Sequence, residues 1–302
     1  MHRRHLFAAA ILATLATTIP ALAESPAMLT PRTSGLAAVN GVNIHYEVYG
    51  EGKPLILIHG GFGSIGMFAP ILPDLAEGRK VIGVDLQAHG RTGPLGRAMT
   101  FSAMATDVAE LIRFLDLEKA DVMGYSLGGG VALRLGIEHP EVVDHLVLVS
   151  TAYAFDNWHD YNQQGMRGIA ANPDATAEGM KGSPMYQGYV AIAPGGAETW
   201  PAAVREVAAL VGQDFDWSAE IPRITAPTLV VVGDWDSVRI AKAAHLFEML
   251  GGSAQDGNWD RSGMNQNRFA VLPNTTHYEA FMSPALPPVV VPFLDGYPTK
   301  TP

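Results

Sequence analysis

Short, continuous apolar runs alternate with helix-like segments in this chain, and this alternation limits the folds open to it. The runs "PLILIHG" (54–60), "KVIGVDL" (80–86), "ADVMGY" (120–125) and "VDHLVLVS" (143–150) have the length and composition of strands. Strands that are apolar on both sides are typical of a parallel sheet with helices covering both faces. The sequence therefore predicts an α/β fold with a mostly parallel sheet.

Helical patterns fill the gaps between these runs, over 67–78, 101–117 and 127–140. In "FSAMATDVAELIRFLDL" the apolar residues share one helical face, and we expect Ser102 to cap this helix. Ahead of the parallel strands, "GLAAVNGVNIHYEVYG" holds two apolar runs broken by Asn40-Gly41. Both residues of an Asn-Gly pair tolerate positive φ, so this segment predicts an antiparallel hairpin.

The strand pattern breaks off at residue 151 and resumes with "APTLVVVGD" (226–234) and "RFAVLPN". The intervening residues are rich in Tyr, Trp, Met, Gly and Pro, which indicates short helices and loops. Ligands of open α/β sheets bind at the carboxyl ends of the strands. We therefore expect 151–226 to form a small helical cap inserted after the sixth strand, with 35–150 and 227–302 forming the core. A polar loop insertion at 251–267 has no assigned purpose.

The first 23 residues have the pattern of a secretory signal peptide. "MHRRHLF" is basic, the next stretch is apolar and small, and Ala21-Leu22-Ala23 fits a cleavage site. We expect cleavage after Ala23, a periplasmic or secreted protein and a flexible lead-in over 24–34, with an uncleaved anchor as the alternative. No other segment resembles a membrane span, so we expect no stable membrane anchor.

Composition excludes several kinds of site. The chain contains no cysteine, which excludes disulfides, a cysteine nucleophile and a thiolate metal site. Its formal net charge of −10 argues against nucleic acid or an anionic membrane as a partner.

The stretch "DVMGYSLGGG" places Ser126 between Gly124 and Gly128, at the junction of a predicted strand and a predicted helix. G-x-S-x-G in that context is the nucleophile elbow, where glycines permit a sharp turn and the helix N-terminus favours negative charge. The alternative is a tight turn with a helix cap. We interpret Ser126 as a nucleophile.

A serine hydroxyl needs a base to accept its proton and an acid to orient that base. His277 follows the last predicted strand and can reach the same edge of the sheet, whereas His245 lies within a helical pattern. Two acids follow "TLVVVG". We expect Asp236 to point to the histidine and Asp234 to hold the turn through backbone N–H groups.

Stabilisation of an oxyanion requires two backbone donors. One is the N–H of Leu127, directly after the serine. The second comes from "HGGFGS" (59–64), where Gly61 and Phe62 are both candidates. We expect His59 to fix this loop through hydrogen bonds.

"LIHGGFGS", "VDLQAHGRT", "MGYSLGGG", "VVGDWDSV" and "PNTTHYEAF" together resemble the motifs of the α/β-hydrolase superfamily, over residues 36–295. "DLQAHGRT" departs from the commoner D-x-x-G-x-G-x-S at Ala88 and Thr92, which affects no proposed catalytic residue. The resemblance implies a serine hydrolase without a cofactor. "DNWHD" (156–160) offers oxygen and nitrogen ligand types but no arrangement around one ion, so no metal is expected.

These features predict an exported serine hydrolase that cleaves an ester-type bond through an acyl-enzyme. The partner would be a small-molecule ester with an apolar part, bound under the Met-rich cap. A lactonase, a carbon–carbon bond hydrolase or a cofactor-free perhydrolase could use the same triad. Relatives that attack with aspartate are disfavoured by Ser126. A ligand-binding receptor on the same fold is the alternative of another class, and the oligomeric state is not predicted.

Overall fold

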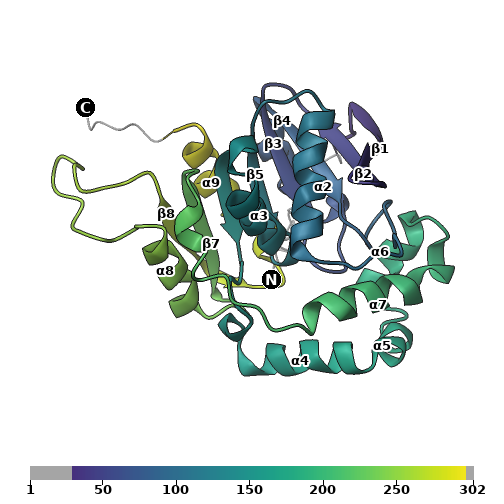
Figure 1. Cartoon of the computed structure of the whole chain (residues 1–302). Helices are drawn as coiled ribbons and strands as arrows, with labels where there is room; N and C mark the ends of the chain where they lie inside the picture. The colour runs from purple at the N-terminus through teal and green to yellow at the C-terminus, as the bar shows by residue number, and fades with distance from the viewer. Residues whose placement is uncertain (1–28, 297–302) are drawn as a thin grey trace, which may run out of the picture.

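The computed structural model describes residues 29–296 (Figure 1), so the predicted signal peptide lies outside the described residues. Eight strands form one sheet in the order β1-β2-β4-β3-β5-β6-β7-β8. β1 and β2 pair antiparallel, β2 pairs antiparallel with β4, and the other neighbours are parallel. The predicted mostly parallel sheet is confirmed. The strands are β1 (Thr33–Val39), β2 (Val42–Tyr49), β3 (Lys53–Ile58), β4 (Arg79–Asp85), β5 (Ala120–Tyr125), β6 (Val143–Val149), β7 (Thr228–Trp235) and β8 (Arg268–Thr276).

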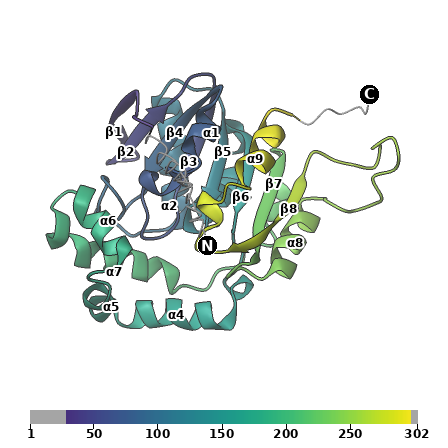
Figure 2. The same cartoon turned by 180° about the vertical axis from the view of Figure 1, so that it is seen from behind.

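Helices cover both faces of this sheet. The sheet-covering helices are α1 (Leu72–Ala76), α2 (Phe101–Phe114), α3 (Leu127–Glu138), α8 (Ile240–Met249) and α9 (Pro287–Leu294). α2, α3 and α8 lie on one face, and α1 and α9 lie on the other (Figures 1 and 2). Each face has its own apolar core, and every residue of β5 is buried between the two. This double coverage explains why the central strands are apolar throughout rather than alternating.

The structure confirms one local prediction and contradicts others. The Asn40-Gly41 hairpin is confirmed, with both residues at positive φ between β1 and β2. Ser102 does not cap α2, because Thr100 accepts the N–H of Ala103 at 3.0 Å and Ser102 bonds to Glu138 instead. The continuous helix expected over 67–78 is also wrong.

That segment forms a short 3-10 helix (Ile65–Phe68) and the five-residue α1, with Pro70 between them. Pro70 has no N–H to donate to a carbonyl of the preceding turn, which accounts for the break. At the start of the fold, β1 begins at Thr33, two residues inside the stretch expected to be a flexible lead-in.

Four helices form between β6 and β7. They are α4 (Asp160–Ala171), α5 (Pro173–Gly179), α6 (Pro184–Ile192) and α7 (Trp200–Val211). They form a separate layer across one end of the sheet, drawn in green below it in Figure 1. We call this layer the cap. The strands β3, β5, β7 and β8 end at the edge that faces it.

The polar insertion at 251–267 contains turns and no helix or strand. It extends away from the core between α8 and β8 in both views (Figures 1 and 2). Within residues 29–296, no helix has the length and apolar character needed to cross a membrane.

Candidate active site

Ser126 occupies a strained turn between β5 and α3, at φ 54° and ψ −115°. A non-glycine residue in such a region is disfavoured by about 1–3 kcal/mol and persists when its surroundings enforce it. A Cβ at Gly124 would lie 2.2 Å from the carbonyl oxygen of Gly128, and one at Gly128 would lie 2.3 Å from that of His59. Both glycines are therefore required for the strand and helix to meet this closely, with the serine at the exposed edge of the turn.

The structure brings Ser126, His277 and Asp236 together although they are up to 151 residues apart in the sequence. Ser126 Oγ lies 3.0 Å from His277 Nε2, and His277 Nδ1 lies 2.8 Å from Asp236 Oδ1. An ionised carboxylate only accepts hydrogen bonds, so Nδ1 carries the proton that His277 donates to Asp236. Nε2 is then free to accept the proton of the serine hydroxyl.

Asp236 is held as a carboxylate by several donors at once. Its Oδ2 accepts the Ser150 hydroxyl at 2.5 Å, and its Oδ1 accepts the Val238 N–H at 3.0 Å as well as His277. Burial by itself raises the pKa of this carboxyl, but the hydrogen bonds outweigh burial and hold the pKa below its ordinary value. Asp236 is therefore charged at neutral pH and able to stabilise a protonated His277.

Asp234 performs the turn-holding role expected for it. Its two carboxylate oxygens accept the backbone N–H groups of Asn274 and Thr275, each at 2.9 Å. These bonds attach the end of β7 to the end of β8, just before His277. Asp234 thus supports the histidine segment without contacting the imidazole.

Two buried histidines fix the loop after β3. His59 Nε2 accepts the Leu86 N–H at 3.1 Å, and His59 Nδ1 donates to the Gly60 carbonyl at 2.7 Å. His89 Nε2 accepts the Phe62 N–H at 2.8 Å. The Phe62 N–H is therefore already used, which corrects its candidacy as an oxyanion donor.

Gly61 is the remaining candidate in that loop. A Cβ on Gly61 would lie 3.6 Å from Leu127 Cδ1, so the Leu127 side chain packs beside Gly61, and both residues line one cavity with Ser126. Among the hydrogen bonds within residues 29–296, none uses the N–H of Gly61 or Leu127 as a donor. The first N–H groups of a helix lack intrahelical acceptors, which leaves the Leu127 N–H available at the start of α3.

Both loop histidines are neutral, and this predicts an acid-sensitive fold. Burial, reinforced by the neighbouring His59, lowers the pKa of His89 to about 3, and burial also lowers the pKa of His59. The unfolded chain takes up these protons near pH 6.5, whereas the folded chain does not. The contribution of His89 is therefore complete above that pH and falls toward pH 3, by about 1.4 kcal/mol per pH unit, and His59 acts in the same direction.

Urea unfolding of wild type and His89→Gln between pH 7.5 and pH 4.5 tests this. Glutamine keeps an oxygen that can accept the Phe62 N–H but cannot take up a proton. We expect its free energy of unfolding to fall less steeply with decreasing pH, by about 1.4 kcal/mol per unit. Parallel slopes for the two proteins would show that His89 is not held neutral.

Two residues at the site were missed in the sequence, Ser150 and Tyr125. Ser150 is fully buried at the end of β6 and donates to Asp236. Tyr125, the residue before Ser126, donates its hydroxyl to the carbonyl of His277 at 2.7 Å. Burial raises the pKa of this hydroxyl, so it remains a donor. In the sequence, each of these two polar residues lies at the carboxyl end of a predicted strand. That position suggests a place near the site but does not show which group the side chain contacts.

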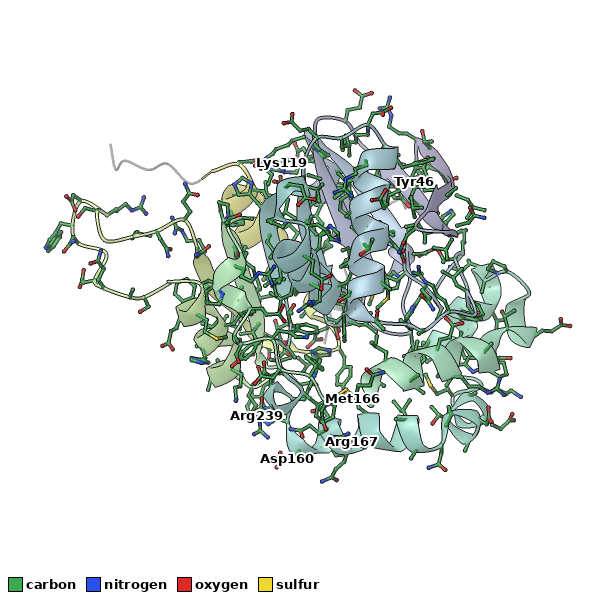
Figure 3. All side chains as sticks on the ribbon, viewed as in Figure 1. Tyr46, Lys119, Asp160, Met166, Arg167 and Arg239 are labelled. Carbon is green, nitrogen blue, oxygen red and sulfur yellow. The ribbon has the colours of Figure 1, made fainter. Side chains whose placement is uncertain are left out.

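Tyr125→Phe removes only the hydroxyl that holds the backbone of His277. Small displacements of a catalytic group can cost up to about 100-fold in rate, so we expect kcat to fall about 10-fold with KM within about twofold. The measurement is steady-state ester hydrolysis across pH 5–9, with Tyr46→Phe as a matched control on β2, away from the cap in Figure 3. An unchanged kcat would contradict a positioning role.

The segment before α4 attaches the cap to the triad. Trp158 pairs with Val238 in an isolated antiparallel bridge, and its ring lies edge-on to the imidazole of His277 at 5.3 Å. Asp160 pairs with Arg239 at 2.6 Å (both labelled in Figure 3), and Asp156 pairs with Lys242 at 2.8 Å. The acids of "DNWHD" are thus bound to cations of the core, which is a structural role.

One cluster within residues 29–296 has the composition of a metal site, formed by Asp121, Asp144 and His145. The ammonium of Lys53 lies 3.0 Å from Asp121 and 2.6 Å from Asp144, so a cation of the protein already neutralises these acids. The cluster lies at the amino ends of the strands, remote from Ser126.

A cavity of ≈ 1040 Å³ lies between the cap and the carboxyl ends of the strands. Ser126, His277, Gly61 and Leu127 all line it. Ser126, the imidazole of His277 and both candidate oxyanion donors therefore face one cavity. This arrangement provides an activated hydroxyl beside donors for developing negative charge, which is the equipment for acyl transfer.

Three features define an α/β hydrolase. They are the eight-stranded sheet, the sharp turn at Ser126 and the hydrogen bonds that link Ser126, His277 and Asp236. A family model described as the α/β hydrolase fold matches residues 53–184, which include Ser126 but neither Asp236 nor His277. The chain has the α/β-hydrolase fold, and the family model of that fold covers less than half of its length.

Among known proteins, the chain is 33% identical over 140 residues to an sn-1-specific diacylglycerol lipase from Danio rerio. That stretch covers 43% of this chain and 44% of the lipase, so the chain spans less than half the length of the curated relative.

Solved structures match over more of the chain. A thermophilic esterase from Thermogutta terrifontis superposes with a TM-score of 0.67 at 21% identity, over 87% of this chain and 98% of that one. The enol-lactonase from Burkholderia xenovorans LB400 gives 0.65 at 22% identity, over 87% and 100%. At these identities the similarity shows the fold alone.

Proposed function

We propose that this protein is a serine hydrolase that cleaves a carboxylic ester-type bond through an acyl-enzyme. The observation that carries the proposal is the continuous hydrogen-bonded chain from Ser126 Oγ through His277 to Asp236, which opens into the cavity. The esterase and lipase names of similar proteins agree with it.

In the proposed mechanism, Ser126 Oγ attacks the acyl carbon while its proton passes to His277 Nε2. The charge that develops on the carbonyl oxygen is stabilised by the N–H groups of Leu127 and Gly61. Asp236 stabilises the imidazolium, which then gives its proton to the leaving alcohol. Water, deprotonated by His277, attacks the acyl-enzyme, and the acid and Ser126 are released.

Partitioning of the acyl group tests whether this intermediate forms. Phenyl, 4-nitrophenyl and 4-chlorophenyl acetate would be hydrolysed in buffer containing methanol. A shared acyl-enzyme requires the same ratio of methyl acetate to acetate from all three esters. A ratio that changes with the leaving group would mean direct attack by water, and no turnover of any ester would favour a ligand-binding receptor.

We further propose that the protein is exported and cleaved after Ala23. Support comes from the basic start, the apolar stretch and the Ala-x-Ala site in the sequence. Expression of the full chain in a Gram-negative host, followed by N-terminal sequencing of the periplasmic fraction, is expected to give a chain that begins at Glu24. An intact N-terminus would contradict cleavage.

A further inference from the structure

The cavity beside Ser126 has an apolar roof. Side chains of α4, α6 and α7 form it, among them Met166, Ile169, Met185, Leu210 and Val211. The uncharged polar residues Asn162 and Gln164 of α4 also line the cavity. Methionine side chains are flexible and adapt to irregular shapes, so this wall can pack against groups of differing outline. The volume of ≈ 1040 Å³ is at the upper end of that of small-molecule sites, which span about 300–1,000 Å³.

Within the described residues, the lining of the cavity also carries no carboxylate, ammonium or guanidinium group. Of the described residues around it, none is Asp, Glu, Lys or Arg. The basic residues of the cap helices are engaged elsewhere. Arg167, next to Met166 on α4 in Figure 3, pairs with Asp214 at 2.5 Å, and Arg205 of α7 pairs with Asp174 at 2.7 Å.

A carboxylate that entered this cavity would lose part of its hydration and meet no Lys or Arg side chain within residues 29–296. Burying an ionised carboxylate without a partner is strongly unfavourable, whereas an apolar group gains from the same burial. The lining therefore discriminates between substrates by charge as well as by size.

We propose that the site selects neutral esters whose acyl group is bulky and apolar and lies against α4 and α7, and that it rejects acyl groups carrying a carboxylate. This inference rests on the proposed ester hydrolysis and adds the substrate class. It separates this chain from any hydrolase whose pocket carries a cation for an anionic substrate.

Three esters of matched acyl length test the charge selection. They are 4-nitrophenyl hexanoate, mono-4-nitrophenyl adipate, which carries a terminal carboxylate, and its methyl ester, in which that carboxylate is neutralised. After subtraction of the uncatalysed rate at pH 7, we expect kcat/KM for the adipate monoester to be at least about 100-fold below that of hexanoate. The methyl ester is expected to be within about 10-fold of hexanoate, because it restores neutrality at similar size.

Equal kcat/KM values for the monoester and its methyl ester would overturn the charge selection. If the protein is not an ester hydrolase, the result is different. 4-Nitrophenyl acetate, whose acyl group is only an acetyl, would then also remain unhydrolysed. Turnover of the acetate with a preference for the adipate monoester would leave the hydrolase proposal intact and contradict only the substrate class.

The placement of the acyl chain is tested by putting a cation in the roof. Met166→Lys and Ile169→Lys lie one helical turn apart on α4, and Met166→Leu and Ile169→Leu are their neutral controls. At least one lysine variant is expected to raise the ratio of kcat/KM for monoester over hexanoate about 10-fold or more, while both leucine variants keep the preference for hexanoate. A ratio unchanged in both lysine variants would overturn the contact between α4 and the acyl chain.

Discussion

Ser126→Ala is expected to lower kcat for ester hydrolysis by about 10⁴-fold or more, because it removes the atom that would form the acyl-enzyme. The substitution removes one oxygen from a side chain at the cavity wall and leaves the backbone turn in place. The fold is therefore expected to persist, with a thermal midpoint within a few degrees of wild type. The measurement is the initial rate of 4-nitrophenyl acetate hydrolysis at matched protein concentration.

A folded Ser126→Ala protein that retains wild-type turnover would remove Ser126 from the mechanism. Residual activity above the uncatalysed rate would not, because backbone donors and substrate positioning act without the nucleophile. The donors that we propose, the N–H groups of Gly61 and Leu127, belong to the main chain, which the substitution leaves intact.

Asp236→Asn is expected to lower kcat by about 10³–10⁴-fold. Oδ1 of Asp236 accepts from both His277 and Val238, and an amide nitrogen in that position would face two donors. If the amide oxygen keeps the Ser150 hydroxyl and the Gly233 N–H, the amide nitrogen takes the place of Oδ1 and donates to His277 Nδ1, so the imidazole carries its proton on Nε2. That nitrogen could no longer accept the proton of the serine hydroxyl.

Asp234→Asn is the matched control, two residues away and with the same change of chemistry. Asp234 holds the backbone of Asn274 and Thr275 and does not contact His277. We expect less than about 10-fold loss of kcat together with lower thermal stability, since a lost hydrogen bond contributes about 0.5–1.5 kcal/mol. If Asp234→Asn lost more activity than Asp236→Asn, the acid would have to be reassigned.

The parallel sheet could be predicted from the sequence because strands buried on both faces are continuously apolar. A run such as "VDHLVLVS" has no polar alternation and so requires cover on both sides. The turn at Ser126 could also be predicted, because only glycine fits where Gly124 and Gly128 approach the neighbouring backbone. Both patterns lie within short segments of the sequence. One requires apolar side chains and the other requires residues without a Cβ.

Contacts between distant segments could not be predicted in this way. The sequence alone does not separate Gly61 from Phe62 as the second oxyanion donor. In the structure, His89, 27 residues after Phe62, accepts the Phe62 N–H. The role of Tyr125 depends on a carbonyl 152 residues away. Serine and threonine are both good N-caps, so the sequence alone does not show whether Ser102 or Thr100 caps α2. The structure shows that Thr100 does.

The most direct test of the proposed serine hydrolase is the intact mass of the protein after brief exposure to a fluorophosphonate. The reagent forms a phosphorus–oxygen bond with an activated serine and releases fluoride. Wild type is expected to gain the mass of one adduct, while Ser126→Ala and urea-unfolded wild type gain none. An equal adduct on folded Ser126→Ala, or none on folded wild type that hydrolyses 4-nitrophenyl acetate, would contradict Ser126 as the nucleophile.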